Sequence, residues 1–138
     1  MERITYNNTI PFVPPISVGK VVKVHAGNHL SVASSICCFP SYYRFPIHIR
    51  GIRCPEKRTS SSTEKRCAFM ARDLVRAKVA DRIISIENID IERYGRIIAD
   101  IFVDGVELKR FLLEEHLAVP EHETPDDWLE YYNQRPKH

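Results

Sequence analysis

The sequence predicts a single α+β domain that is mainly β, with a five-stranded barrel and two to three helices. The first observation is the order of its segments: three strand-like runs, a helical segment, two more strand-like runs and a second helix. The second is its size, because 138 residues with 43% hydrophobic side chains suffice for one core of ordinary dimensions. A barrel interrupted by a helix after its third strand is the arrangement of the OB fold, so we expect an OB-type β-barrel.

The first three strands are predicted from β-rich runs and turn residues. They occupy residues 19–24, 30–32 and 47–52. Gly27 and Asn28 suit the two-residue loop of a hairpin between the first two strands, because glycine accepts a positive φ without steric cost. The third run alternates apolar and polar residues, which is typical of a strand with one buried face. Residues 34–46, which include Cys37 and Cys38, are interpreted as an extended hairpin tip or loop.

Helix signals place the remaining elements. Ser61 and Glu64 have the spacing of a capping box, and apolar residues follow at helical intervals to about residue 80. The other predicted elements are strands at residues 83–91 and 96–103, a second helix at 107–117 and a short third helix opened by residues 124–127. Pro125 suits the first turn of that third helix, which carries Trp128 and Tyr131.

We divide the chain into three parts. Residues 1–17 are an N-terminal arm, because they are polar and then contain three prolines, which disfavour regular pairing. Residues 18–119 are the barrel domain. Residues 120–138 are an acidic and aromatic C-terminal segment, expected to pack on the domain or to extend from it.

Charge is distributed unevenly along a chain whose net charge is only +2. From residue 44 to residue 78, 10 Lys or Arg residues stand against three acidic residues. From residue 104 to residue 130, nine acidic residues stand against two basic ones. A basic middle suggests a face that attracts phosphate, and the alternative is the ordinary charge of solvated helices and loops.

Composition excludes several other classes of protein. No run approaches the ~20 apolar residues of a membrane span, and the first residues lack a secretory pattern, so we expect no membrane partner and a cytoplasmic location. The four cysteines show no zinc spacing. They are interpreted as reduced thiols, with Cys67 packed as a small hydrophobic residue.

Several motifs, in this order, resemble the staphylococcal nuclease-like (thermonuclease) family. They are Arg53-Cys54-Pro55-Glu56 after the third strand, the helix beginning near Ser62, Glu92-Arg93-Tyr94-Gly95-Arg96 before the fifth strand, and Leu112 to Ala118. The resemblance covers residues 18–119. It implies an OB-type fold and phosphodiester hydrolysis, for which the family uses a Glu and two Arg around one calcium ion.

The resemblance implies a catalytic set of Glu56, Arg96 and His48. Glu56 follows Pro55 where the family has its Glu, and a carboxylate there can align or deprotonate a water that attacks phosphorus. Arg96 matches one family Arg, whose fork can hold two phosphate oxygens, and a salt bridge at the barrel rim is the structural alternative. His48 stands where the family has its other Arg, and it lacks the fork and the permanent charge.

The family's calcium positions are altered in this sequence. Asn28 and Arg53 stand where the family has calcium-binding Asp residues, and a cation there would repel the ion. The resemblance therefore implies a degenerate calcium site, and we expect no metal or other cofactor. Two alternatives remain open: Arg53 replaces the charge of the metal, or three histidines gather around a transition metal with Glu56. Those histidines are His25, His29 and His48.

Three functions are compatible with these residues. The first is a nucleic-acid-binding domain for DNA or RNA with lost or altered hydrolysis. Its expected contacts are Arg53, Lys57, Arg58, Arg93 and Tyr94, with Tyr42 and Tyr43 as further stacking candidates. The second is an active DNA or RNA endonuclease with a changed metal requirement. The third is a protein-interaction module that uses residues 120–138.

Overall fold

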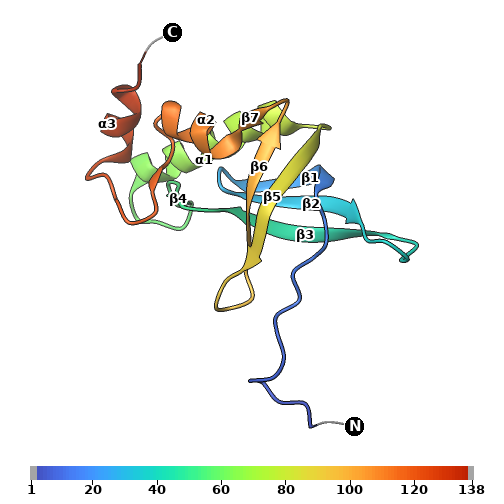
Figure 1. Cartoon of the computed structure of the whole chain (residues 1–138). Helices are drawn as coiled ribbons and strands as arrows, with labels where there is room; N and C mark the ends of the chain where they lie inside the picture. Colours follow the sequence, from blue (N-terminus) through green and yellow to red (C-terminus); the bar gives the residue numbers. More distant parts are fainter. Residues whose placement is uncertain (1–2, 137–138) are drawn as a thin grey trace.

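Five long strands close into a barrel in the computed structural model, which describes residues 3–136 (Figure 1). The strands are β1 (Val18–Ala26), β2 (His29–Ser35), β3 (Tyr42–Ile49), β5 (Ile83–Ile91) and β6 (Ile97–Val103). Neighbouring strands pair antiparallel in the order β3-β2-β1-β5-β6, and a parallel pairing of β3 with β6 closes the barrel. The expected five-stranded OB-type barrel is therefore confirmed, and it carries three helices.

The three helices lie at the upper side of the barrel in Figure 1, and the N-terminal arm leaves from the lower side. They are α1 (Ser62–Val79), α2 (Leu108–Glu114) and α3 (Trp128–Asn133). Ser61 caps α1 as predicted, because its hydroxyl accepts a hydrogen bond from the Glu64 backbone N–H at 3.2 Å. The second helix ends at Glu114, earlier than predicted, and the third begins only after Asp127, whose carboxylate caps it.

Of the two interpretations of residues 34–46, an extended hairpin tip or a loop, the first half of β3 agrees with the hairpin. Tyr42 pairs with Ser35 and Arg44 with Ala33, so this part of the chain belongs to the hairpin of β2 and β3. Tyr42, Tyr43 and Arg44 are all exposed. Since neither face of this part is buried, the sequence shows no alternation there by which a strand could be recognised.

The β1–β2 turn forms where it was predicted, with Ala26 opposite His29, but for a different reason. Gly27 does not have a positive φ. Instead, a Cβ atom at Gly27 would lie 3.0 Å from the Cβ of Ala71 in α1 and 3.2 Å from the Sγ of Cys54. Glycine is therefore favoured here because the turn approaches α1 closely, not because of its φ angle.

Three short strands complete the sheets: β4 (Ile52–Arg53), β7 (Val106–Glu107) and β8 (Val119–Pro120). Gly51, with φ +79°, makes the turn that separates β3 from β4. The strand predicted over residues 47–52 is therefore broken in two. β4 pairs with β8, which brings Arg53 opposite Val119 and ties the chain after α2 to the end of the barrel.

The core is formed by the inner faces of the strands together with α1 and α2. Its largest fully buried side chains include Leu30, Ile47, Ile84, Ile101, Leu108 and Leu112. Cys67 is buried in this core, as the sequence predicts, and so is Cys54. No helix within residues 3–136 is long and apolar enough to cross a membrane.

The C-terminal segment packs on the domain in the described residues. Trp128 is only 5% exposed, and the hydroxyl of Tyr131 donates to the carbonyl oxygen of Ala118 at 3.1 Å. The His116 ring stacks on Tyr131 with a centroid distance of 4.4 Å. Trp128 and Tyr131 therefore serve internal packing. A partner bound through residues 120–138 stays a prediction.

Candidate functional site

A cavity of about 610 Å³ lies at one end of the barrel. It is enclosed by the β1–β2 turn, the end of β3, the chain after β4, the residue before β6 and the segment after β8. Its walls are Ala26, Asn28, His29, His48, Ile52, Arg53, Cys54, Pro55, Glu56, Lys57, Arg58, Arg96 and Glu121. A second cavity of about 340 Å³ shares Asn28, His48, Ile52, Arg96 and Glu121 with it, so the two cavities adjoin, and we call them together the cleft.

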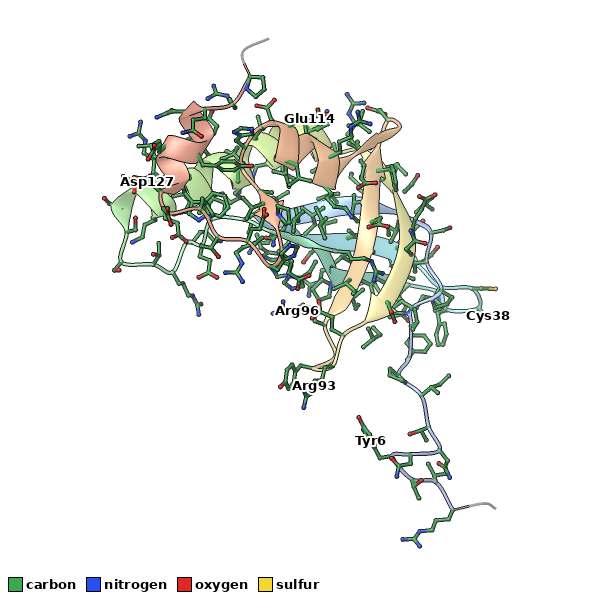
Figure 2. All side chains as sticks on the ribbon, turned by 60° about the vertical axis from the view of Figure 1, so that its left-hand side comes forward. Tyr6, Cys38, Arg93, Arg96, Glu114 and Asp127 are labelled. Atoms are coloured by element: carbon green, nitrogen blue, oxygen red, sulfur yellow. The ribbon has the colours of Figure 1, made fainter. Side chains whose placement is uncertain are left out.

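The structure brings together most of the side chains that the sequence nominates. Glu56, Arg96 and His48 line the larger cavity, and so do the expected nucleic-acid contacts Arg53, Lys57 and Arg58. Arg93 and Tyr94 do not line it. Figure 2 shows Arg93 farther out on the β5–β6 loop than Arg96. Tyr94 is 89% exposed, with the Arg93 guanidinium 5.6 Å from its ring centroid.

Glu56 is held through its backbone by the first turn of α1. Its N–H donates to the Oε2 atom of Glu64 at 2.9 Å, so Glu64 does not close the capping box predicted for it with Ser61. Cys54 and Pro55, just before Glu56, are buried. The Glu56 side chain is itself exposed on the cavity wall, so its carboxylate is free to meet a ligand while its backbone is fixed.

Arg96 is positioned by a tight turn between β5 and β6. The Glu92 N–H donates to the carbonyl oxygen of Arg96 at 2.8 Å, and Gly95 has φ +84°, a conformation that favours glycine. Within residues 3–136, Arg96 takes part in no ion pair. The salt bridge at the barrel rim, considered as the structural alternative for this residue, is not formed there.

The other cations of the cleft contact neutral groups. An Nη atom of Arg53 donates to the hydroxyl of Thr124 at 3.1 Å, and Lys57 Nζ donates to the carbonyl oxygen of His25 at 2.5 Å. These contacts orient the side chains without neutralising their charge. We call the set Arg53, Lys57, Arg58 and Arg96 the cleft cations. None of them is in an ion pair within the described part of the chain.

Three histidines form a stack across β1, β2 and β3, which we call the histidine ladder: His25, His29 and His48. His29 lies opposite His48 in the pairing of β2 with β3, and their ring centroids are 3.9 Å apart. The His25 and His29 centroids are 4.5 Å apart. His25 Nε2 is hydrogen-bonded to the Ser31 hydroxyl at 2.7 Å, whereas His29 Nε2 is buried without a hydrogen-bond partner.

The environment of the ladder favours neutral imidazole rings. Burial lowers the pKa of His48 to about 4, and the charge of Arg96 and the neighbouring His25 add to this effect. Burial also lowers the pKa of His29 to about 4, assisted by the other two rings, Arg96 and Lys57. The pKa of His25 is lowered by burial and by Lys23 and Lys57. At neutral pH the ladder is therefore uncharged in the free protein.

The histidines do gather, as the transition-metal hypothesis requires, but they face one another rather than a shared point. The planes of His29 and His48 lie 16° apart in a stack. In residues 3–136 no group of three or more His, Cys, Asp or Glu side chains is placed to hold a metal ion. Burial also raises the pKa of Cys54 to about 12, which removes it as a thiolate ligand or nucleophile.

The sequence reasoning missed two features of this cleft. Glu121, which follows β8, lines both cavities, because its N–H donates to the carbonyl oxygen of Gly51 at 3.0 Å. The stacking of the ladder depends on the register between strands, which periodicity does not fix. The one available signal was that His25 and His29 flank a predicted two-residue hairpin loop, with His48 on the next strand.

Comparison with known proteins identifies the family. The family model described as staphylococcal nuclease homologue matches residues 46–136, which is more than half of the chain. The match contains Glu56, the other cleft residues that follow β3, and α3. No match was found among curated proteins. From the family match and the barrel that supports it, we conclude that this chain belongs to the staphylococcal nuclease family.

Proposed function

We propose that this chain is a nuclease-like nucleic-acid-binding domain in which calcium-dependent phosphodiester hydrolysis is lost or altered. The observation that carries the proposal is the placement of the cleft cations. They come from β4, from the chain after it and from the residue before β6, line one cavity and have no carboxylate partner among the described residues. Phosphate groups are the anions that such a surface attracts, and binding then depends strongly on salt.

Arg96 is the central phosphate contact in this proposal. A guanidinium can hold two phosphate oxygens through parallel N–H bonds, and these bonds are charge-assisted. Its flanking cations would hold neighbouring phosphates along the strand. Because these expected contacts are to the phosphates of the backbone, we expect binding of DNA or RNA without sequence specificity.

The loss or alteration of calcium dependence is supported by the donor set. Calcium takes six to eight oxygen ligands as a rule, and carboxylates supply most of its affinity. At the family's two Asp positions this chain has the neutral Asn28 and the cationic Arg53, and both line the cavity. A guanidinium charge in the wall repels a divalent ion, so these residues do not fit calcium. The charge of Arg53 is instead available to a phosphate.

An active nuclease with a changed metal requirement is the second candidate, and the fixed backbone of Glu56 favours it. A carboxylate on a fixed loop can accept the proton of a water that attacks phosphorus. Arg96 would stabilise the negative charge that grows on the phosphoryl oxygens during that attack. His48, neutral at pH 7, can donate one hydrogen bond to the same group.

The test combines binding and cleavage in the same samples. Labelled single-stranded and double-stranded DNA and RNA are incubated with the protein in EDTA, calcium, magnesium, manganese or zinc. Salt-sensitive binding without cleavage supports the binding domain. Cleavage that Glu56→Gln abolishes supports the enzyme, whereas cleavage that survives Glu56→Gln contradicts the site. Glu114→Gln, a change on the exposed face of α2, is the matched control.

Calcium binding is tested in a separate experiment. The double variant Asn28→Asp and Arg53→Asp adds two carboxylates to the cavity wall and removes a cation. We expect titration calorimetry to detect calcium binding to the double variant and none to the unaltered chain. Equal heats for the two proteins would show that these positions do not decide calcium affinity.

A further inference from the structure

The histidine ladder lies in the wall of the cleft, beside Arg96, and nothing described so far uses it as a unit. We propose that the ladder is an acid-dependent phosphate subsite, at which a nucleic-acid phosphodiester next to Arg96 binds together with a proton. This inference rests on the proposed nucleic-acid binding. It goes further because it joins His48 of the expected catalytic set with His25 and His29, and assigns a ligand and a condition to the three rings together.

The geometry places two rings of the ladder at the cavity. His29 and His48 both line it, together with Arg96 and Lys57, and His48 and Arg96 also line the adjoining cavity. His29 Nε2 has no hydrogen-bond partner although the atom is buried. Buried polar atoms are almost always paired, so this nitrogen is an unsatisfied group of the free protein.

The charged groups around the ladder are cations. Lys23 from β1, Lys57 from the chain after β4 and Arg96 before β6 all act on its rings, and each ring acts on its neighbours. Glu56 and Glu121 line the same cavity, but no carboxylate forms an ion pair with a histidine within residues 3–136. What the ladder lacks for holding a proton is therefore a nearby anion.

A bound phosphodiester supplies that anion. A negative charge within a few ångströms favours the protonated form of an imidazole, so the pKa of His48 rises from about 4 when the phosphate binds. The bound protein then holds more protons than the free protein at any pH between the two pKa values. Binding therefore tightens as the pH falls through this range, by up to about tenfold per pH unit for each proton taken up.

The sign of the effect follows from the direction of the shift. The pKa of His48 is higher in the complex than in the free protein. The proton-linked part of the affinity is therefore fully present when the pH lies below the pKa of the free protein. It disappears as the pH rises through the pKa of the complex. When the pH is above the pKa of the complex, Arg96 and the other cleft cations bind the phosphodiester without the ladder, so the affinity no longer depends on pH. A permanently charged arginine at position 48 would produce no such dependence.

The experiment measures affinity against pH at constant ionic strength. A fluorescently labelled single-stranded DNA and an abasic oligonucleotide of the same length are titrated with the full chain from pH 8 to pH 5, with circular dichroism as the check of folding at each pH. The variants are His48→Gln and His29→Gln. The matched control is His122→Gln, which changes an exposed histidine that lines neither cavity.

We expect the unaltered chain and His122→Gln to bind both oligonucleotides more tightly as the pH falls, and the two ladder variants to lose most of this slope. An unchanged slope in both ladder variants overturns the subsite. A slope with DNA that is absent with the abasic oligonucleotide overturns phosphate as the ligand. If the affinity for inorganic phosphate depends on pH and the affinity for both oligonucleotides does not, the subsite binds free phosphate and not a nucleic acid. Binding without any slope overturns the inference and leaves the proposed function standing, whereas no binding at any pH overturns both.

A second measurement applies even if a ladder variant folds poorly. Histidine ring signals in NMR spectra report the pKa of each imidazole in the unaltered chain, without and with the abasic oligonucleotide. We expect the pKa of His48 to rise on binding, and the ring signals of His122 serve as the control. Equal values for His48 in the free and bound states would contradict the proposal.

Discussion

Two sets of cations in this protein, which together do not include all of them, differ in their partners. Outside the cleft, Arg72, Arg82, Lys109 and Arg110 each lie within 4.0 Å of a carboxylate. In the cleft, the four cleft cations contact no carboxylate among residues 3–136. Both sets consist of Lys and Arg side chains, so the presence or absence of a carboxylate partner is what distinguishes them. Exposed ion pairs contribute little to stability, whereas unpaired cations gathered on one wall repel one another and gain most from an incoming anion.

The largest effect should come from removing the fork of Arg96. We expect Arg96→Ala to weaken nucleic-acid binding by about 1.5–3 kcal/mol, roughly ten- to a hundredfold, because it removes a charge-assisted bond to phosphate. Fluorescence anisotropy at low salt measures this change. Arg110→Ala, which removes a paired cation from α2, should leave affinity within about twofold. Equal reductions in the two variants would mean that the pairing of a cation does not predict its role.

A second effect concerns stability, and it follows from the burial of the ladder, to which the neighbouring cations add. The pKa values of His29 and His48 are near 4 in the folded protein, against the ordinary value of 6.5 in the unfolded chain. The unfolded chain therefore binds more protons between these values, and the free energy of unfolding should fall as the pH drops from 6.5 to 4. Urea unfolding at several pH values measures this. The double variant His29→Gln and His48→Gln should show a shallower fall, and an equally steep fall would exclude the ladder as its cause.

A smaller effect is expected at the edge of the cleft. Arg58→Gln should lower affinity a few-fold and make the slope of log K against log salt shallower by about 0.7–0.9, because one fewer phosphate charge is neutralised. Binding isotherms at several salt concentrations give this slope. Arg93→Gln on the β5–β6 loop tests the same point for a predicted nucleic-acid-binding residue that lies outside the cavity. A larger change of slope for Arg93→Gln than for Arg58→Gln would move the interface toward the loop.

The smallest effect should come from the paired group. Glu114→Gln breaks the Arg110 ion pair, whose two side chains are largely exposed, and should change the free energy of unfolding by less than about 0.5 kcal/mol. It also frees Arg110 without placing it in a cleft. If nucleic-acid affinity rose as much in Glu114→Gln as it fell in Arg96→Ala, any unpaired cation on the surface would bind nucleic acid equally well. The cleft would then not be the binding site.

The sequence predicted the barrel because its signals are local. A capping residue such as Ser61, a two-residue turn and the alternation of residues 47–52 each specify a segment by itself, and the order of the segments then fits one fold. The motif around Glu56 likewise predicted which side chains gather in the cleft. Their chemical roles stay predictions.

What the sequence did not predict depends on register and on close approach. The first half of β3 has no buried face, so Tyr42 and Tyr43 gave no strand pattern. The histidine ladder exists only because His29 lies opposite His48, and a shift by one residue would turn one ring to the other face. Gly27 was correctly placed in a turn, but only the positions of Ala71 and Cys54 show why glycine is favoured there.

The pairing of β4 with β8 and the closure of β3 on β6 join segments that are distant along the chain. Bringing such segments together reduces conformational entropy before any stabilising interaction compensates for it, so pairings of this kind form slowly. Each of these two strand pairings brings together residues of the cleft. His48 and Arg53 lie on β3 and β4, whereas Arg96 and Glu121 lie next to β6 and β8. A partly folded chain could have α1 and the hairpin of β1 and β2 while still lacking a binding surface. Appearance of nucleic-acid affinity during refolding would then mark the moment at which the barrel closes.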